Sequence, residues 1–274
     1  MRYGDAYHTI DINDDVVVKY TKLEEVDLRC EKLFYRTCTH LKMPKVIQWD
    51  PFTLERIRGR HASYDDYDEI IKQLSHMHQS TTTLEVATDD IRYEIYDKLV
   101  QRYKPCPMKE YINGVKIKTY EQALYFMKHV DIPLKYKCMI HGDPHFENIM
   151  VNEDGLYFID PRGYFGKTDL YGVAEYDIAK VHFALSGYNA FEHMNSYKFD
   201  DVIDIQIHEK AFSLDFFTHV LLCSIWLGNS HVYQGEKFVM SRHFALYIFT
   251  LFCLKYKIDI EKDDSHSRCI RTTR

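Results

Sequence analysis

The chain of 274 residues carries 35 Lys and Arg against 41 Asp and Glu, which gives a formal net charge of −6 at pH 7. Apolar residues make up 46% and charged residues 28%, as in folded globular proteins, and the length allows one large domain or two smaller ones. Because no long basic block occurs, no nucleic-acid partner is expected, although Arg56, Arg58 and Arg60 form a short basic cluster.

The seven cysteines are widely spaced and form no C-x-x-C pair, so neither a disulfide framework nor a zinc ribbon is predicted. Reduced thiols are typical of the cytoplasm, which is the location we expect. The N-terminus lacks the apolar segment of a signal peptide. The longest apolar run, residues 244–254, is too short to cross a bilayer, so no membrane partner is expected. The oligomeric state does not follow from the sequence.

The first 57 residues are predicted to form a small β-rich lobe. Alternating or β-branched runs that are separated by turn residues indicate strands, and apolar residues at helical spacing indicate a helix. The expected elements, in chain order, are a hairpin over 7–12 and 16–19, a helix within 24–41, and strands at 45–49 and 53–58.

Residues 58–274 are predicted to form a mainly helical lobe, so that the whole chain has an α+β, two-lobed fold. After Asp259 the chain is polar and is expected to be loose. Besides a β region at 138–160, the expected elements are helices over 65–79, 90–104, 118–130, 175–186, 200–230 with a break, and 238–256.

A hairpin is predicted over residues 149–159, where two short apolar strands flank the turn sequence NEDG. If Val151 pairs with Leu156, the antiparallel register carries Asn148 and Asp160 to the same open end of the hairpin. Two oxygen ligands at such an end suit Mg²⁺, which takes a few protein oxygens together with substrate phosphates.

Asp143 lies in the loop that leads into this hairpin, between Gly142 and Pro144, which favour a tight and fixed loop. A carboxylate beside a metal–phosphate site can accept the proton of a hydroxyl group. Any one polar residue here could be a turn or capping residue. The joint spacing H-x-D-x-H-x-x-N, from His141 to Asn148, favours a catalytic role instead.

The segment HGDPHFEN, followed by FID, resembles the catalytic loop and metal-binding Asp of the aminoglycoside phosphotransferase and choline kinase family. That family has a protein-kinase-like fold. The resemblance implies that Asp143 is the catalytic base and that Asn148 and Asp160 bind Mg²⁺. The loop motif of the family, H-G-D-x-H-x-x-N, is matched at His141, Gly142, Asp143, His145 and Asn148.

Weaker similarity extends over most of the chain. Residues 74–79 resemble the L-x-x-L-H helix of the family, and residues 175–181 resemble its Y-D-L-A helix. By this resemblance Asp177 has a structural role and braces the catalytic loop, in which His141 also serves as support.

The small lobe matches the family at a possible phosphate-binding lysine. Lys19 ends a β-branched strand, and Glu31 has the helical placement of its ion-pair partner, although a lone lysine there could also be a solvated strand end. Backbone groups around Glu55, Arg56 and Ile57 would contact the adenine of the co-substrate, ATP or GTP.

Two features depart from the family. Only 18 residues precede Lys19 and Gly4 is the sole glycine among them, so a Gly-rich loop is not visible and a first strand could be missing. The kinase motif D-F-G is replaced by D-P-R-G at residues 160–163. Arg162 could contact phosphate or an acidic acceptor, or pair with a structural carboxylate, and His145 is a second possible phosphate or substrate contact.

The sequence therefore predicts a small-molecule kinase that moves the γ-phosphate of ATP or GTP to a hydroxyl of a sugar, amino alcohol or aminoglycoside. A non-catalytic nucleotide-binding protein of the same fold is one alternative. Another is a metal-dependent phosphohydrolase, which would leave Asn148 and Lys19 unexplained. Its metal ligands would be His141, Asp143, His145 and Asp160.

The acceptor is the least determined part of this prediction. Tyr, Asp and Glu residues and Trp226 in the helical part would suit a cationic acceptor, because aromatic and acidic side chains bind organic cations. The same aromatic residues could equally form the core of the helical lobe.

Overall fold

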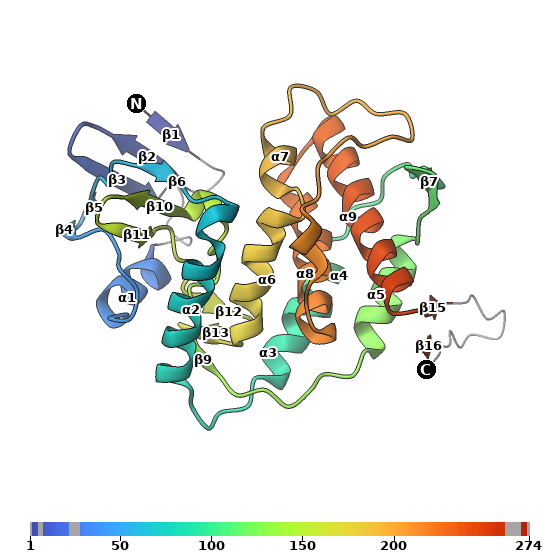
Figure 1. Ribbon diagram of the computed structural model, residues 1–274, viewed down its shortest axis with the longest axis horizontal. Helices are drawn as coiled ribbons and strands as arrows, with labels where there is room; N and C mark the ends of the chain where they lie inside the picture. Colours follow the sequence, from blue (N-terminus) through green and yellow to red (C-terminus); the bar gives the residue numbers. More distant parts are fainter. Residues whose placement is uncertain (1, 5–7, 22–27, 261–269, 273–274) are drawn as a thin grey trace. The chain divides into compact units, whose positions relative to one another are not determined.

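The computed structural model describes residues 2–4, 8–21, 28–260 and 270–272 (Figure 1). The chain divides into two compact units. Unit 1 comprises Met1–Ala87 and Lys135–Val181, and unit 2 comprises Thr88–Leu134 and His182–Arg274. The lobe boundary expected near residue 57 is a different division, and it stays a prediction.

Unit 1 begins with a five-stranded antiparallel sheet in the order β1-β2-β3-β5-β4. The turn before β3 forms because the Asn13 side chain accepts hydrogen bonds from the backbone N–H groups of Asp15 and Val16. A first strand is present, so the alternative that it is missing is wrong; residues 5–7, where a phosphate loop would lie, are outside the described residues. The strands are β1 Arg2–Gly4, β2 His8–Ile12, β3 Val16–Thr21, β4 Val46–Trp49 and β5 Phe52–Glu55.

Helix α1, Arg29–Thr37, lies beside this sheet (Figure 1). The ring of Tyr35 in this helix packs edge to face against Phe52 of β5, with ring centroids 5.5 Å apart. Leu28, Phe52 and Leu54 form the buried centre of this contact. Because burial of such side chains stabilises by about 1.5–3 kcal/mol each, the contact fixes the helix and with it the position of Glu31.

The predicted hairpin is confirmed in register as well as in place, because Val151 pairs with Leu156. Its first strand, β10, also pairs with β6. The approach to β6 requires glycine, since a Cβ on Gly59 would lie 2.2 Å from the carbonyl oxygen of Val151. The further elements of unit 1 are β6 Arg60–His61, α2 Tyr67–Thr81, β9 Cys138–Met139, β10 Ile149–Asn152, β11 Gly155–Phe158, β12 Tyr164–Phe165, β13 Thr168–Asp169 and β14 Tyr171–Gly172.

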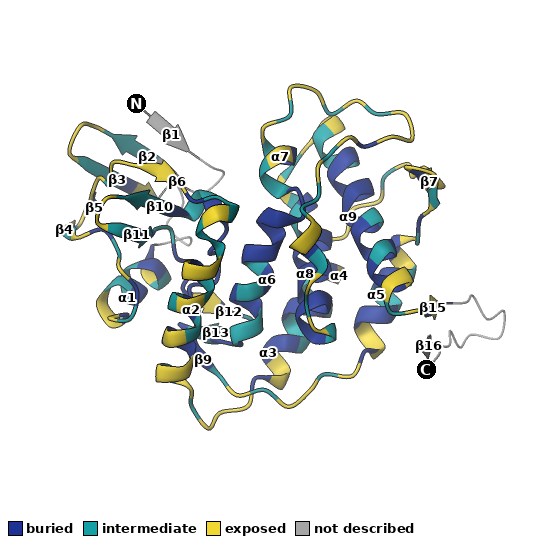
Figure 2. Ribbon diagram, in the orientation of Figure 1, coloured by how far each residue is buried: buried dark blue, intermediate teal, exposed yellow. Residues whose placement is uncertain are grey.

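Unit 2 is mainly helical, and α8 and α9 lie side by side in it, with α8 buried along almost its whole length (Figure 2). Helix α6, Ala174–Leu185, runs from unit 1 into unit 2. The π-helical turn Tyr93–Asp97 joins α3 to α4. The other elements are α3 Thr88–Arg92, α4 Lys98–Gln101, β7 Tyr111–Ile112, β8 Val115–Lys116, α5 Tyr120–His129, α7 Tyr188–Glu192, α8 Phe216–Asn229, α9 Gly235–Lys255, β15 Ile258–Ile260 and β16 Ile270–Thr272.

Two expectations for the helical part were wrong. Residues 200–208 are not helical, because Asn113 exchanges two hydrogen bonds with the backbone of Ile203 and holds this segment extended. Helix α8 starts only at residue 216, where Asp215 accepts hydrogen bonds from the first backbone N–H groups. The end of the chain is not wholly loose either, since β16 pairs antiparallel with β15.

Helix α9 is long and apolar enough to span a membrane by length and composition, but 67% of its most apolar window is buried inside the protein. Burial of that kind is typical of a core helix, so the observation is weak support for a membrane span. The fold is α+β, with a sheet-rich N-terminal part and a helical C-terminal part, as predicted.

Candidate active site

A cavity of about 490 Å³ lies within unit 1, in the size range of small-molecule sites. Its walls are largely apolar and come from the N-terminal sheet, from the segment after β5, and from the β10–β11 hairpin. At its polar end it is lined by Lys19 and Asp160. The apolar lining consists of Ile10, Ile12, Val17, Pro44, Leu54, Ile57, Met150 and Ile159.

The segment predicted to contact adenine, Glu55–Ile57, does line this cavity. Two of its three backbone N–H groups are already bonded: that of Glu55 donates to the carbonyl of Lys45, and that of Arg56 donates to the carbonyl of Asp15. No hydrogen bond joins the backbone N–H of Ile57 to another described residue. Ile57 is therefore the group of this segment that can donate to a ligand.

Lys19 lies between two carboxylates. Its Nζ is 2.5 Å from Oε1 of Glu31, and it also pairs with Oδ1 of Asp160. Burial alone would lower the pKa of Lys19, but the two carboxylates outweigh it and raise this pKa. Burial raises the pKa of Glu31 to about 7, despite the opposing effect of Lys19. Lys19 is thus a buried ammonium, 6% exposed, at the end of an apolar cavity.

Asn148 and Asp160 lie at the same open end of the hairpin, because the backbone N–H of Ile159 donates to the carbonyl of Asn148. The Asn148 amide nitrogen donates to the carbonyl of Asp143, which leaves its side-chain oxygen free to coordinate a cation. Asp160 pairs with Lys19 through only one carboxylate oxygen and is 40% exposed. An amide oxygen and a carboxylate oxygen at one end of a hairpin fit the modest ligand set that Mg²⁺ requires.

Asp143 forms an ion pair with Lys180 of α6, whose Nζ lies 2.8 Å from Oδ1. Burial alone would raise the pKa of Asp143, but the ammonium of Lys180 beside it holds this pKa well below its usual range. The other predicted contact, His145, is buried, and burial lowers the pKa of its imidazole. Its Nε2 is 3.9 Å from Oδ2 of Asp143, beyond hydrogen-bonding distance.

The backbone of the catalytic loop is held by Asp177, which is fully buried. Its two carboxylate oxygens accept hydrogen bonds from the N–H groups of His141 and Gly142, at 2.9 and 2.7 Å. Nε2 of His78 lies 2.9 Å from the same carboxylate. The ring of His141 packs edge to face against Phe34, with centroids 5.8 Å apart.

Arg162 contacts tyrosines. Its guanidinium donates to the hydroxyl of Tyr176 at 2.6 Å and lies 4.0 Å from the ring centroid of Tyr164. Gly163 after it has a φ of +66°, and a Cβ there would lie 2.4 Å from the carbonyl oxygen of Cys30. Glycine at this position therefore lets the segment after Asp160 pass against α1.

Two residues of this site, Lys180 and His78, were not among those predicted from the sequence. Both lie in the helices that resemble the family, and Lys180 follows Asp177 by three residues. That spacing places both side chains on one face of α6, which is the signal that could have revealed Lys180.

The metal-dependent hydrolase alternative requires a cluster of His and carboxylate ligands for a transition metal. Within the described part of the chain, no three His, Cys, Asp or Glu side chains are grouped to hold a metal ion. The hydrolase alternative needs four such ligands, so the geometry disfavours it.

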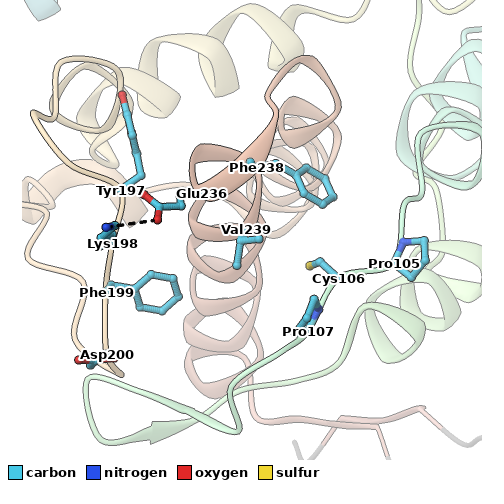
Figure 3. Close-up of a pocket in the computed structure, with 11 residues that line it drawn as sticks. Pro105, Cys106, Pro107, Tyr197, Lys198, Phe199, Asp200, Glu236, Phe238 and Val239 are labelled. Carbon is cyan, nitrogen blue, oxygen red and sulfur yellow. Dashed lines mark ion pairs between the residues drawn. The ribbon is translucent and has the colours of Figure 1, made fainter.

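A larger cavity, about 910 Å³, lies within unit 2 between α9, the segment around Cys106 and residues 197–200 (Figure 3). Figure 3 shows Phe199, Phe238 and Val239 on its walls, and the ion pair of Lys198 and Glu236 at 3.8 Å. Both members of this pair are exposed, with 78% of the Lys198 side chain and 59% of the Glu236 side chain accessible, whereas Lys19 in the cavity of unit 1 is buried.

The aromatic residues of unit 2 are largely core. Trp226 is fully buried and donates its indole N–H to Ser186, 2.7 Å away. An aromatic and acidic cage does exist beside α9, but the side chain of Lys237 occupies it. The Lys237 ammonium lies 2.7 Å from Glu192 and 4.6–5.7 Å from three ring centroids, those of Phe191, Tyr197 and Tyr233.

No protein-family model and no curated protein matches this sequence. Several solved structures do match the structure of this protein. Choline kinase LicA from Streptococcus pneumoniae is 16% identical, and the match covers 91% of this chain and 92% of that chain with a TM-score of 0.52. The chain has a choline-kinase-like fold. A choline kinase from Cryptosporidium parvum, 12% identical, matches over 94% of this chain and 88% of that chain, also with a TM-score of 0.52. Similarity at these identities establishes the fold, which is the protein-kinase-like fold expected from the catalytic-loop motif.

Proposed function

We propose that the protein is a phosphotransferase that moves the γ-phosphate of ATP or GTP to a hydroxyl group of a small molecule. The observation that carries the proposal is the cavity of unit 1. It combines an apolar slot of about 490 Å³ with a buried lysine and a carboxylate at one end. An apolar slot suits a purine base, and a cation beside a metal-binding carboxylate suits its phosphates.

In this proposal the backbone of Ile57 binds the base, and Lys19, anchored by Glu31, contacts the phosphates. Asn148 and Asp160 hold Mg²⁺, which neutralises phosphate charge when bound. Arg162 and His145 contact the acceptor or the transferred phosphate in this proposal. Burial lowers the pKa of His145, so its imidazole is neutral.

Asp143 orients the acceptor hydroxyl and takes its proton. The acceptor oxygen forms a bond to the γ-phosphorus while the bond from that phosphorus to the bridging oxygen breaks. The nucleoside diphosphate leaves, and the proton passes from Asp143 to solvent. Because Lys180 holds the pKa of Asp143 low, orientation of the hydroxyl contributes more than strong basicity.

The acceptor class we propose is a sugar, an amino alcohol or an aminoglycoside. The choline kinase fold and the hydroxyl-directed chemistry of Asp143 support this range, and neither selects one member of it. Such an enzyme would act in the cytoplasm, where nucleotide is available and thiols stay reduced; the six described cysteines form no disulfide.

A panel assay tests the proposal. The protein is incubated with Mg²⁺ and either ATP or GTP, with and without each acceptor, and the phosphorylated product is identified by mass spectrometry. We expect acceptor-dependent release of the nucleoside diphosphate, lost in Asp143→Asn. Nucleotide binding without turnover on any acceptor would favour the non-catalytic alternative, and hydrolysis without a phosphorylated acceptor would favour a phosphohydrolase.

A further inference from the structure

Lys180 and Asp143 form a pair that is largely withdrawn from water. The Lys180 side chain is 14% exposed and that of Asp143 31%, and the two are joined at 2.8 Å. Removing two charges from water is costly, and such pairs are weak contributors to stability. A pair of this kind at the catalytic loop therefore suggests a role beyond stabilising the fold.

The two carboxylate oxygens of Asp143 are not equivalent. Oδ1, which faces Lys180, is sealed from solvent, although the side chain as a whole is partly exposed. Oδ2 lies 3.9 Å from His145, too far for a hydrogen bond. Lys180 thus engages one oxygen and leaves the other as the oxygen that can receive an acceptor hydroxyl.

Helix α6 holds the catalytic loop at two points. Asp177 accepts hydrogen bonds from the backbone N–H groups of His141 and Gly142, just before Asp143. Lys180, one helical turn later, holds the Asp143 side chain itself. Backbone and carboxylate are fixed by the same rigid element, which is the arrangement that precise positioning of a functional group requires.

We propose that Lys180 is a positioning residue, which locks the Asp143 carboxylate so that Oδ2 faces the acceptor hydroxyl. This inference rests on the proposed function, and it predicts that Lys180 acts on turnover only through Asp143. A misplacement of a reacting group by about 1 Å can cost on the order of 10²-fold in rate. Loss of Lys180 should therefore lower kcat far more than it changes the KM for nucleotide.

A double-mutant cycle tests the proposal, with Lys180→Met, Asp143→Asn and the double variant. Lys180→Met keeps the length of the side chain and removes its charge. We expect it to lower kcat by about 10–100-fold in the wild-type background, and by less than about twofold in the Asp143→Asn background. Lys180→Arg should recover part of the loss. Lys135→Met is the matched control, because Lys135 pairs with Glu175 of the same helix, and its kcat should stay near that of the wild type.

Urea unfolding of the same four proteins gives a readout that does not depend on turnover. If the two side chains interact, the double variant should unfold at a higher urea concentration than the summed shifts of the single variants predict. Additive shifts would overturn the proposal, and so would equal losses of kcat in both backgrounds or no loss at all. A wild-type protein without turnover would instead overturn the proposed function, while the unfolding cycle would still decide whether Lys180 holds Asp143.

Discussion

The ammonium of Lys19 lies 2.5 Å from the carboxylate of Glu31. It also forms an ion pair with Asp160, which is 141 residues later in the chain. One lysine thereby holds together a strand, a helix and the end of the β10–β11 hairpin. When a nucleotide binds, its phosphates would compete with Asp160 for this cation. The lysine is therefore the residue whose loss should affect nucleotide binding most directly.

The first prediction concerns this lysine. Lys19→Met should weaken nucleotide binding by about 10–100-fold, because a hydrogen bond to a charged group contributes about 1.5–3 kcal/mol. Isothermal titration with ATP and GTP in the presence of Mg²⁺ measures the change. Lys32→Met is the control, since Lys32 is on the same helix as Glu31 but does not line the cavity. Equal affinities in the wild type and in Lys19→Met would remove Lys19 from the phosphate site.

The second prediction concerns the metal site. Asp160→Ala should abolish the Mg²⁺-dependent part of nucleotide binding and leave the fold intact, because Asp160 lies at the open end of the hairpin and is 40% exposed. Binding is measured with and without Mg²⁺, and circular dichroism monitors the fold. Asp154→Ala removes a carboxylate from the exposed turn of the same hairpin and should have no effect. Normal turnover of Asp160→Ala at limiting Mg²⁺ would show that the ligand is assigned wrongly.

The third prediction concerns Asp143. Asp143→Asn preserves the shape of the side chain and removes its charge, so turnover should fall by about 10²–10⁴-fold. That loss corresponds to roughly 3–5 kcal/mol in the activation barrier. Nucleotide affinity should change little, because Asp143 does not line the cavity. Steady-state kinetics with a confirmed acceptor, together with the nucleotide titration, separate the two effects. Near wild-type turnover would exclude the kinase mechanism.

The local parts of this site were predictable from the sequence, and its long-range contacts were not. The register of the hairpin follows from a short turn and two apolar strands, so the placement of Asn148 and Asp160 at the same open end could be derived. The pairing of Lys180 with Asp143 joins residues 37 positions apart in sequence. It depends on how α6 packs against the catalytic loop, which no spacing in the sequence determines.

The errors in the fold have the same origin. Residues 200–208 were expected to be helical, but they are held extended by Asn113, which lies 90 residues before its hydrogen-bond partner Ile203. The pairing of β15 with β16 was also missed, because the polar sequence after Asp259 shows no alternating pattern that predicts a strand. Both cases illustrate tertiary contacts that override a local preference.

The fourth prediction is that the protein loses stability as the pH is lowered, because of His219. This histidine is 1% exposed, stacks on Phe212 with ring centroids 5.2 Å apart, and neither ring nitrogen has a hydrogen-bond partner among the described residues. Burial, assisted by the positive charge of Lys255, lowers its pKa to about 3.

In the unfolded chain the same imidazole has a pKa of about 6.5, so between about pH 3 and 6.5 the unfolded state binds more protons than the folded state. Stability therefore rises with pH in this window and is lost as the pH falls below about 6.5. For one such group the free energy of unfolding should decrease by about 2 kcal/mol between pH 8 and pH 5.

His219→Phe removes the titrating group and keeps an aromatic ring against Phe212. Urea unfolding at pH 8 and pH 5 should show that this variant loses about 2 kcal/mol less than the wild type over the same interval. His129→Phe is the control, because His129 is exposed in the same unit, and it should keep the wild-type pH dependence. If His219→Phe and His129→Phe lose equal stability on acidification, the buried imidazole is not the source of the effect, and other acid-sensitive groups must account for it.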